Sequence, residues 1–207
     1  MKCSGAGIVP IFIKENKVYI VTFIDRQNMA SDAGGKIDGD HTCDDKIIKK
    51  TALRELFEES SGLIKLQSLK ESVSYDIKNK DNFYRLFFVI INKINFKHFD
   101  KNLNKFNLYK LNPFNEMYSI KLLDMETIKF DKKDIIINTI EDEIVKISYR
   151  LKFVLYKVMR KFKTFEKFYS SLKIKKYILK KKIIDIESEE YDSNKKFKID
   201  DIVCYKS

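Results

Sequence analysis

The segment from Arg54 to Gly62 constrains this chain more than any other part of it. In a helix of about 3.6 residues per turn, Glu55, Glu58 and Glu59 stand at i, i+3 and i+4 and project from one narrow face. Three carboxylates held this close repel one another, so a helix selected only for stability would avoid them. A hard divalent cation such as Mg2+ removes the penalty because it takes oxygen ligands. The pattern favours a metal site, and a solvated acidic face is the alternative.

The same segment has the other marks of a helix that packs on a core. Thr42 and Asp45 resemble a capping box that opens a helix running to about Ser61, and Gly62 is a C-terminal stop. The apolar face beside the glutamates comprises Ala52, Leu53, Leu56 and Phe57. We expect one face to pack while the neighbouring face holds metal.

Runs rich in β-forming residues surround this helix. Residues 7–13 and 18–24 are predicted to form a hairpin, and residues 72–77 alternate like a strand. Residues 83–91 indicate a more deeply buried strand, and 116–123 a further one. This order predicts an α+β fold in which a mixed sheet is flanked by helices.

The pattern changes to helix from Asp131 onward. Apolar residues recur at three- and four-residue steps between Ile147 and Leu172. Between Lys146 and Lys182 stand 14 lysines and arginines and one acidic residue, giving a local net charge of +13, whereas the whole chain carries +11. The positive charge is therefore an attribute of this one segment.

Length and composition favour one domain with an appendage. The chain has 207 residues, of which 44% are hydrophobic, enough for a substantial core. We predict a domain over 1–130, a basic helical region over 131–185 packed on it or extending it, and a polar tail over 186–207. The three widely spaced cysteines favour a reducing, cytoplasmic compartment, and no signal peptide or membrane span is expected.

Residues 34–40, 51–59 and 62–63 together resemble the Nudix box, G-x5-E-x7-R-E-U-x-E-E-x-G-U, where U is aliphatic. Two departures are visible. Between Gly35 and Arg54 lie 18 residues, more than in the pattern, so the intervening Glu is absent and Asp40 or Asp44 is only a loose substitute. A second Ser after the glutamates delays the closing Gly by one position. Neither departure touches the three glutamates.

The resemblance implies a Nudix-like mixed sheet and a hydrolase that cleaves diphosphate linkages with Mg2+ or Mn2+. The implied metal ligands are Glu55, Glu58, Glu59 and a backbone carbonyl near Gly34 or Gly35, with Gly35 preferred. The implied catalytic residues are Glu58, Glu59 and Glu116, among which the general base is left open. Arg54 is expected to pair with a neighbouring glutamate and orient it, and Lys36 to contact a phosphate. An ordinary surface charge is the alternative for Arg54, and an ordinary loop carboxylate is the alternative for Glu116.

The basic helical segment bears on the substrate. Its lysines and arginines alternate with aromatic residues, which suits phosphate contacts combined with base stacking. The chain also resembles, in size, charge and composition, the small Nudix proteins of large DNA viruses that remove mRNA caps. The predicted RNA-binding residues are Lys146, Arg150, Lys157, Arg160, Lys161 and Lys163.

The favoured function is therefore Mg2+- or Mn2+-dependent hydrolysis of capped RNA within its triphosphate bridge. One alternative is a Nudix hydrolase of nucleoside diphosphate derivatives or diphosphoinositol polyphosphates. A second is a non-catalytic RNA-binding protein on a Nudix scaffold. For the basic helix alone, solvated lysines or a membrane-surface helix are the competing interpretations. The oligomeric state is not predicted.

Overall fold

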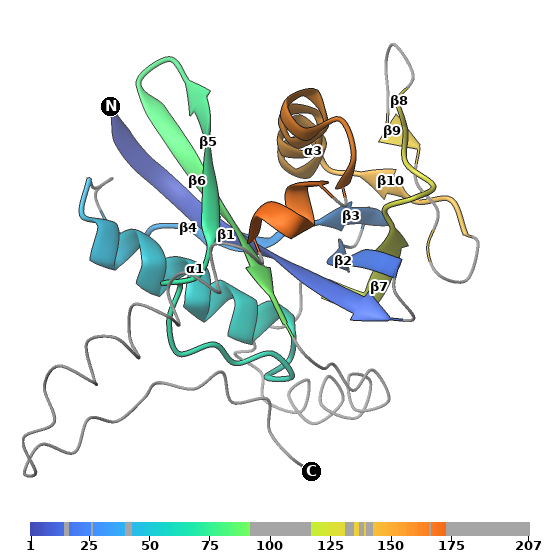
Figure 1. Cartoon of the computed structure of the whole chain (residues 1–207). Coiled ribbons are helices and arrows are strands. Elements are labelled where there is room, and N and C mark those ends of the chain that lie inside the picture. The colour runs from blue at the N-terminus through green and yellow to red at the C-terminus, as the bar shows by residue number, and fades with distance from the viewer. Residues whose placement is uncertain are drawn as a thin grey trace, which may run out of the picture.

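The computed structural model describes residues 1–14, 17–25, 27–39, 43–91, 117–130, 135–136, 139, 143–165 and 167–172. Its centre is an eight-stranded mixed sheet (Figure 1). The strands of this sheet are β1 (Lys2–Lys14), β2 (Lys17–Asp25), β3 (Met29–Ser31), β4 (Ala33–Lys36), β5 (Val73–Asn79), β6 (Asn82–Ile90), β7 (Met117–Asp124) and β10 (Lys146–Ile147). The predicted α+β class is confirmed, and so are the hairpin β1–β2 and the strands β5, β6 and β7.

Strand β1 connects the two halves of the sheet. Along one edge it pairs in parallel with β6 from Lys2 to Ile11. Along the other edge it pairs first with β4, over residues 5–8, and then with β2, over residues 11–14. Because β1 exchanges β4 for β2 along this edge, β4 and β2 separate from each other. Residue 32, which links β3 to β4, lies near the point of separation.

Helix α1 (Asp45–Glu59) carries the three glutamates. Its N-cap is Asp44, whose carboxylate accepts a hydrogen bond from the Lys46 amide at 2.8 Å. The predicted Thr42–Asp45 capping box is therefore wrong: the helix begins at Asp45, and Thr42 lies outside the described residues. An aspartate directly before the first helical residue supplies the cap instead.

The helix ends where the sequence predicts, with one difference. Ser61 and Gly62 both have positive φ angles, of 52° and 76°, and their amides donate to the carbonyls of Glu58 and Phe57. This is a Schellman arrangement in which Ser61 takes the left-handed position that glycine usually holds. The extra serine of the box thus adds one left-handed residue to the turn, and Gly62 completes it.

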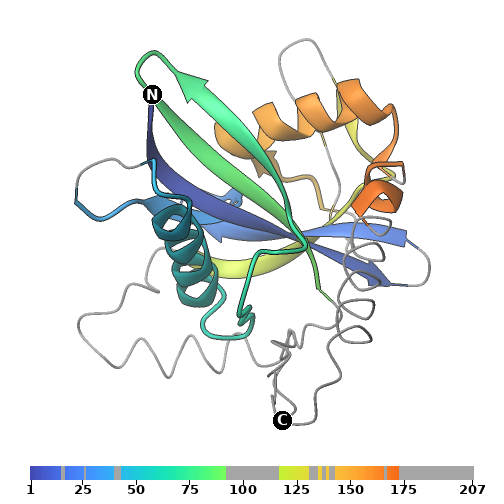
Figure 2. The same ribbon diagram turned by 60° about the vertical axis from the view of Figure 1, so that its left-hand side comes forward.

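Two helices cover opposite faces of the sheet (Figures 1 and 2). On one face α1 packs through Ile48, Ala52 and Leu56, which share a core with residues of β1, β2 and β6. On the other face lies α3 (Tyr149–Phe162), whose buried residues belong to a second core. The basic helical region, as far as residue 172, is thus part of the globular fold.

The helix that the sequence pattern predicts from residue 131 onward is not seen in the described residues before Tyr149. Residues 129–147 include the short strands β8 (Lys129–Phe130), β9 (Ile135–Ile136) and β10. β-branched Ile and Val residues favour such short strands, and β10 pairs in parallel with β3. The helical pattern is also interrupted, because α3 ends at Lys163, which has a φ of 69°. Helix resumes over residues 165–172, of which residue 166 is not described.

Candidate active site

The three glutamates of α1 lie in two different environments: Glu55 and Glu58 pair with an arginine, and Glu59 is buried. Arg54 forms a fork that donates to Glu55 Oε1 at 2.6 Å and to Glu58 Oε2 at 2.7 Å. Asp38 lies 3.7 Å from the same guanidinium. The expected pairing of Arg54 with neighbouring glutamates is present, and it offsets the repulsion between two of the carboxylates. Its orienting role in a reaction stays a prediction.

Glu59 lies deeper than the other two glutamates. The residue is 6% exposed, and its Oε2 atom is buried without a hydrogen-bond partner. Burial raises the pKa of Glu59 well above its ordinary value, and the nearby carboxylates of Asp32 and Glu55 raise it further. A hydrogen bond from the backbone of Gly34 and the charge of Arg150 act in the opposite direction. An unpartnered carboxylate oxygen inside a protein is costly and calls for an explanation.

The paired glycines of β4 bring the backbone against these carboxylates. A Cβ at Gly35 would collide with the carboxylate of Glu55, and one at Gly34 would collide with the Tyr84 hydroxyl. Only residues without a side chain permit this approach. Strand β4 and helix α1 therefore place Gly34, Gly35, Glu55 and Glu59 together, as the sequence interpretation grouped them.

Sequence reasoning missed the residues that lie behind the glycines. Asp32, fully buried, accepts hydrogen bonds from the Tyr84 hydroxyl at 2.8 Å and from Arg150 Nε at 3.2 Å. Arg150 also lies over the Tyr84 ring, 4.6 Å from its centroid. The available signal was an aspartate immediately before Ala33-Gly34-Gly35, next to a short buried strand. The partners of Asp32 are 52 and 118 residues away and gave no local signal.

The donor set suits a hard cation, although its members are not assembled around a common point. Among the residues that the structure describes, no three His, Cys, Asp or Glu side chains are arranged as a metal site. The guanidinium of Arg54 pairs with Glu55 and Glu58. The buried, unpartnered Oε2 of Glu59 and the carboxylate of Glu55 against Gly35 are oxygen donors of the kind that Mg2+ and Mn2+ accept.

The remaining predicted site residues are spread more widely. Lys36 is exposed at the end of β4, and Asp44 serves as the helix cap. Asp40, Glu116 and the lysines beyond residue 172 lie outside the described residues. For these residues the predicted roles stay predictions.

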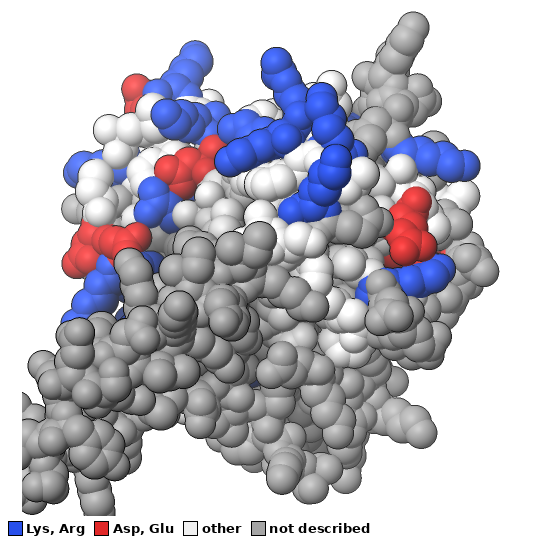
Figure 3. Space-filling model, viewed as in Figure 1, with Lys and Arg blue, Asp and Glu red and all other residues white. Residues whose placement is uncertain are grey.

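The basic residues of α3 divide into two groups. Lys157, Arg160, Lys161 and Lys163 are exposed, as is Lys146 in β10. Figure 3 shows lysine and arginine side chains gathered over α3 and over the neighbouring end of the β5–β6 hairpin. Arg150 differs from the others, because its guanidinium is directed to Asp32 and to the carbonyl of Gly34, 3.4 Å from Nη2.

Aromatic residues share the outer face of α3 with these cations. Tyr149 is 75% exposed and Tyr156 is 58% exposed. Tyr149 stacks on Phe153 with ring centroids 6.3 Å apart, and Lys157 Nζ lies 4.5 Å from the Phe153 centroid. Residues 149, 153, 156 and 160 follow one another at three- and four-residue steps, so they form a stripe along the helix. We call this set the α3 stripe.

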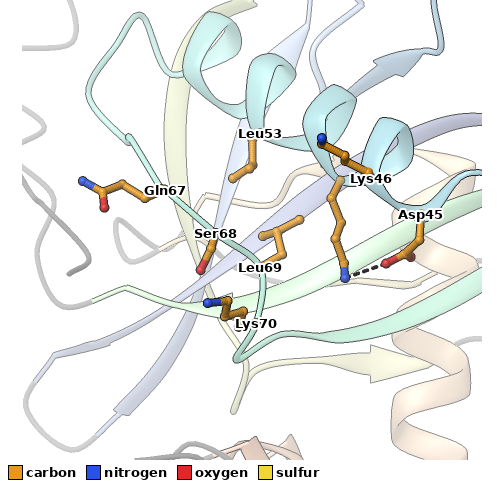
Figure 4. A pocket seen from close by; sticks show the side chains of 8 residues that line it. Asp45, Lys46, Leu53, Gln67, Ser68, Leu69 and Lys70 are labelled. Carbon is orange, nitrogen blue, oxygen red and sulfur yellow. Dashed lines mark ion pairs between the residues drawn. The ribbon is translucent and has the colours of Figure 1, made fainter. Parts of the chain in front are cut away.

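A shallow groove of about 340 Å³ runs beside the first half of α1 (Figure 4). Leu53 and Leu69 supply apolar lining, and Lys46, Lys49 and Lys70 supply positive charge. Asp45 and Lys49 form an ion pair of 2.6 Å in this groove. The groove is separate from the glutamates that face Gly34 and Gly35.

Comparisons with known proteins give limited similarity. No family model matches the chain, and no curated protein matches it. Among solved structures, a C. elegans Ap4A hydrolase in a binary complex is 15% identical with a TM-score of 0.34, covering 59% of this chain and 80% of its own. The NUDIX domain of Shewanella oneidensis NrtR, complexed with ADP ribose, is 12% identical with a TM-score of 0.33. This match covers 61% of this chain and 75% of the NrtR chain.

Similarity at this level does not establish a family. In the described part of the chain, no helix has the length and apolar character needed to cross a membrane.

Proposed function

We propose that this chain is a Mg2+- or Mn2+-dependent hydrolase of phosphoanhydride bonds, of the Nudix type. The observation that carries the proposal is the placement of Glu55 and Glu59 against Gly34 and Gly35, with one buried oxygen of Glu59 unpartnered. A bound ligand would account for a buried, unpartnered carboxylate oxygen at the end of α1.

The proposed roles follow from the positions of the residues. Glu55, Glu58 and Glu59 would hold the ion together with the carbonyl of Gly35. When bound, the ion supplies charge neutralisation on the phosphates and lowers the pKa of a bound water. Arg54 already contacts two of these carboxylates and keeps them close together. The general base is Glu58, Glu59 or Glu116, and Lys36 contacts a phosphate.

For the substrate we propose capped RNA, cleaved within the triphosphate bridge to release the cap-side nucleotide and leave a 5′-phosphorylated RNA. The α3 stripe supports this choice. It offers exposed tyrosines, Tyr149 and Tyr156, beside exposed cations such as Lys157 and Arg160. Single-stranded nucleic acid binds to surfaces of this composition through base stacking and phosphate contacts. A hydrolase of small nucleotides has no need of them.

The test is a hydrolysis screen with the full chain and either Mg2+ or Mn2+. The substrates are cap-labelled RNA, free cap dinucleotide, nucleoside diphosphate derivatives and diphosphoinositol polyphosphates. We expect capped RNA to be cleaved faster than the dinucleotide and the rate to fall with salt, since phosphate contacts on a single strand contribute a slope of about 0.7 each on a log–log plot. Equal turnover of dinucleotide and long RNA would leave small molecules as the substrate class.

Two variants separate catalysis from RNA binding in the same screen. Glu58→Gln should abolish hydrolysis while RNA affinity stays unchanged. Tyr156→Ala combined with Arg160→Met should weaken RNA binding, with each stacked base contributing about 1–3 kcal/mol, and should leave dinucleotide hydrolysis intact. RNA binding without hydrolysis of any substrate by the unmodified chain would favour the non-catalytic scaffold.

A further inference from the structure

The carboxylate of Asp32 lies between the two helical layers of the molecule. It is fully buried in the short link between β3 and β4. Its Oδ2 accepts from Tyr84, while Oδ1 accepts from Arg150 and from the Ser31 hydroxyl at 3.3 Å. A buried carboxylate is tolerated when it is paired and hydrogen-bonded, and removing one partner alone is strongly destabilising.

Arg150 reaches this carboxylate from the opposite side of the sheet to α1. It belongs to the first turn of α3, which packs in the other core. The Ser148 side chain does not cap α3, and its Oγ is buried without a partner. The start of the helix is instead held by the pairing of β10 with β3 and by the Ser148 amide, which donates to the Ala30 carbonyl at 2.8 Å. Arg150 follows two residues later, directed at Asp32.

Gly34 connects this pair to the glutamates. Its carbonyl accepts from Arg150 Nη2, and its backbone hydrogen-bonds to the carboxylate of Glu59. The same glycine is in close contact with the Tyr84 hydroxyl and with the backbone of Gly7, since a Cβ there would collide with both. A short chain of contacts thus runs from α3 through Asp32 and Gly34 to α1.

We propose that Arg150 is a positioning residue of the active site: together with Asp32 it holds β4 so that Gly34 and Glu59 keep the geometry needed for the divalent ion. This inference rests on the proposed function, which supplies the role of Glu59. It also gives α3 a second task beside RNA binding, because the helix that carries the α3 stripe also anchors the glycine strand.

The test compares Arg150→Met with Lys129→Met in the full chain. Both variants remove one positive charge, but Lys129 is exposed in β8 and belongs neither to the glutamate site nor to the predicted RNA-binding residues. We expect Arg150→Met to weaken Mn2+ binding, measured by titration calorimetry, and to lower kcat by about 10- to 100-fold, the range found when a group that orients a metal ligand is removed. The KM for capped RNA should change much less than kcat.

Two further variants keep the test decisive if Arg150→Met fails to fold. Arg150→Lys retains the charge and should recover part of the Mn2+ affinity, and Tyr84→Phe removes one hydrogen bond to Asp32 and should lower kcat by a smaller factor. Mn2+ affinity and kcat equal to those of Lys129→Met in every folded variant overturn the inference alone. An unmodified chain that neither binds Mn2+ nor hydrolyses any substrate overturns the proposed function, and the inference with it.

Discussion

At the scale of single residues, the site is defined by how each charge is balanced. Arg54 offsets two of the helix glutamates, and Arg150 offsets Asp32. Among the described residues no cation forms an ion pair with Glu59, and its backbone hydrogen bond from Gly34 leaves Oε2 without a partner. This difference makes Glu59 the residue whose substitution reports most directly on the site.

Glu59→Gln should stabilise the metal-free protein at pH 7 by about 1–3 kcal/mol, because a neutral amide replaces a buried and incompletely hydrogen-bonded charge. Because burial raises the pKa of Glu59, the folded state binds the proton more tightly than the unfolded state. Glu59 therefore adds to the free energy of unfolding in full below its ordinary pKa of 4.5. This added stability is lost as the pH rises through the raised pKa. Urea unfolding in EDTA from pH 4 to 8 measures both effects.

The matched control is Glu126→Gln, which removes a half-exposed carboxylate paired with Lys17. It should change the free energy of unfolding by less than about 0.5 kcal/mol at every pH. A gain in Glu59→Gln that does not shrink as the pH falls would contradict the burial argument.

At the scale of elements, α3 combines an inner face that is buried in the core with an outer face that is exposed to solvent. Leu151, Val154, Leu155 and Val158 are fully buried, whereas Tyr149 and Tyr156 are largely exposed. Amphipathic helices usually present charged residues to water. The two exposed tyrosines on the outer face are the residues that we propose for stacking on RNA bases.

Leu155→Ala should lower the free energy of unfolding by about 2–5 kcal/mol, because it leaves a cavity in the core under α3. Tyr149→Ala, on the same helix, should change it by less than about 0.5 kcal/mol. Urea denaturation of the two variants measures both values. A large loss in Tyr149→Ala would mean that this ring stabilises the fold and is not free to stack on a base.

How far sequence predicts these elements depends on how local their causes are. The glutamate face, the end of α1 and the strands β1, β2, β5, β6 and β7 follow from periodicity and turn residues close in the chain. The cap at Asp44 was missed because two adjacent aspartates and Thr42 compete for that place. Strands β9 and β10 are two residues long, too short to show any periodicity. β10 in addition depends on pairing with the distant strand β3, whereas β9 pairs with its neighbour β8.

The same reasoning applies to the site. Glu55, Glu59 and the glycines lie in one recognisable motif, and the structure brings them together. Asp32 and Tyr84 belong to no motif, and Arg150 was assigned only to RNA binding because helical periodicity says nothing about which cation faces inward. Three-dimensional packing decides that.

At the scale of the whole molecule, the sheet needs a helix on each face. The core under α3 includes Val9, Ile11, Leu86 and Phe88 from the middle of the sheet. Without α3 these side chains would be open to water, and Asp32 would be buried without its cation. We therefore expect the residues before 148 to need α3 for stable folding.

A chain truncated after Ser148 should fail to unfold cooperatively and should bind a hydrophobic dye such as ANS, as states with exposed apolar surface do. The full-length chain carrying Arg160→Met is the control and should unfold in a single transition. A truncated chain with the melting temperature of the full chain would show that the sheet is stable with one face bare.

The distance in sequence between Asp32 and Arg150 has a consequence for the order of events during synthesis. The carboxylate is made early, and its guanidinium partner follows 118 residues later. A nascent chain on the ribosome therefore contains the glycines and all three glutamates well before the cation that lets Asp32 be buried. The two halves of the site can therefore come together only after α3 has been made and has docked on the sheet.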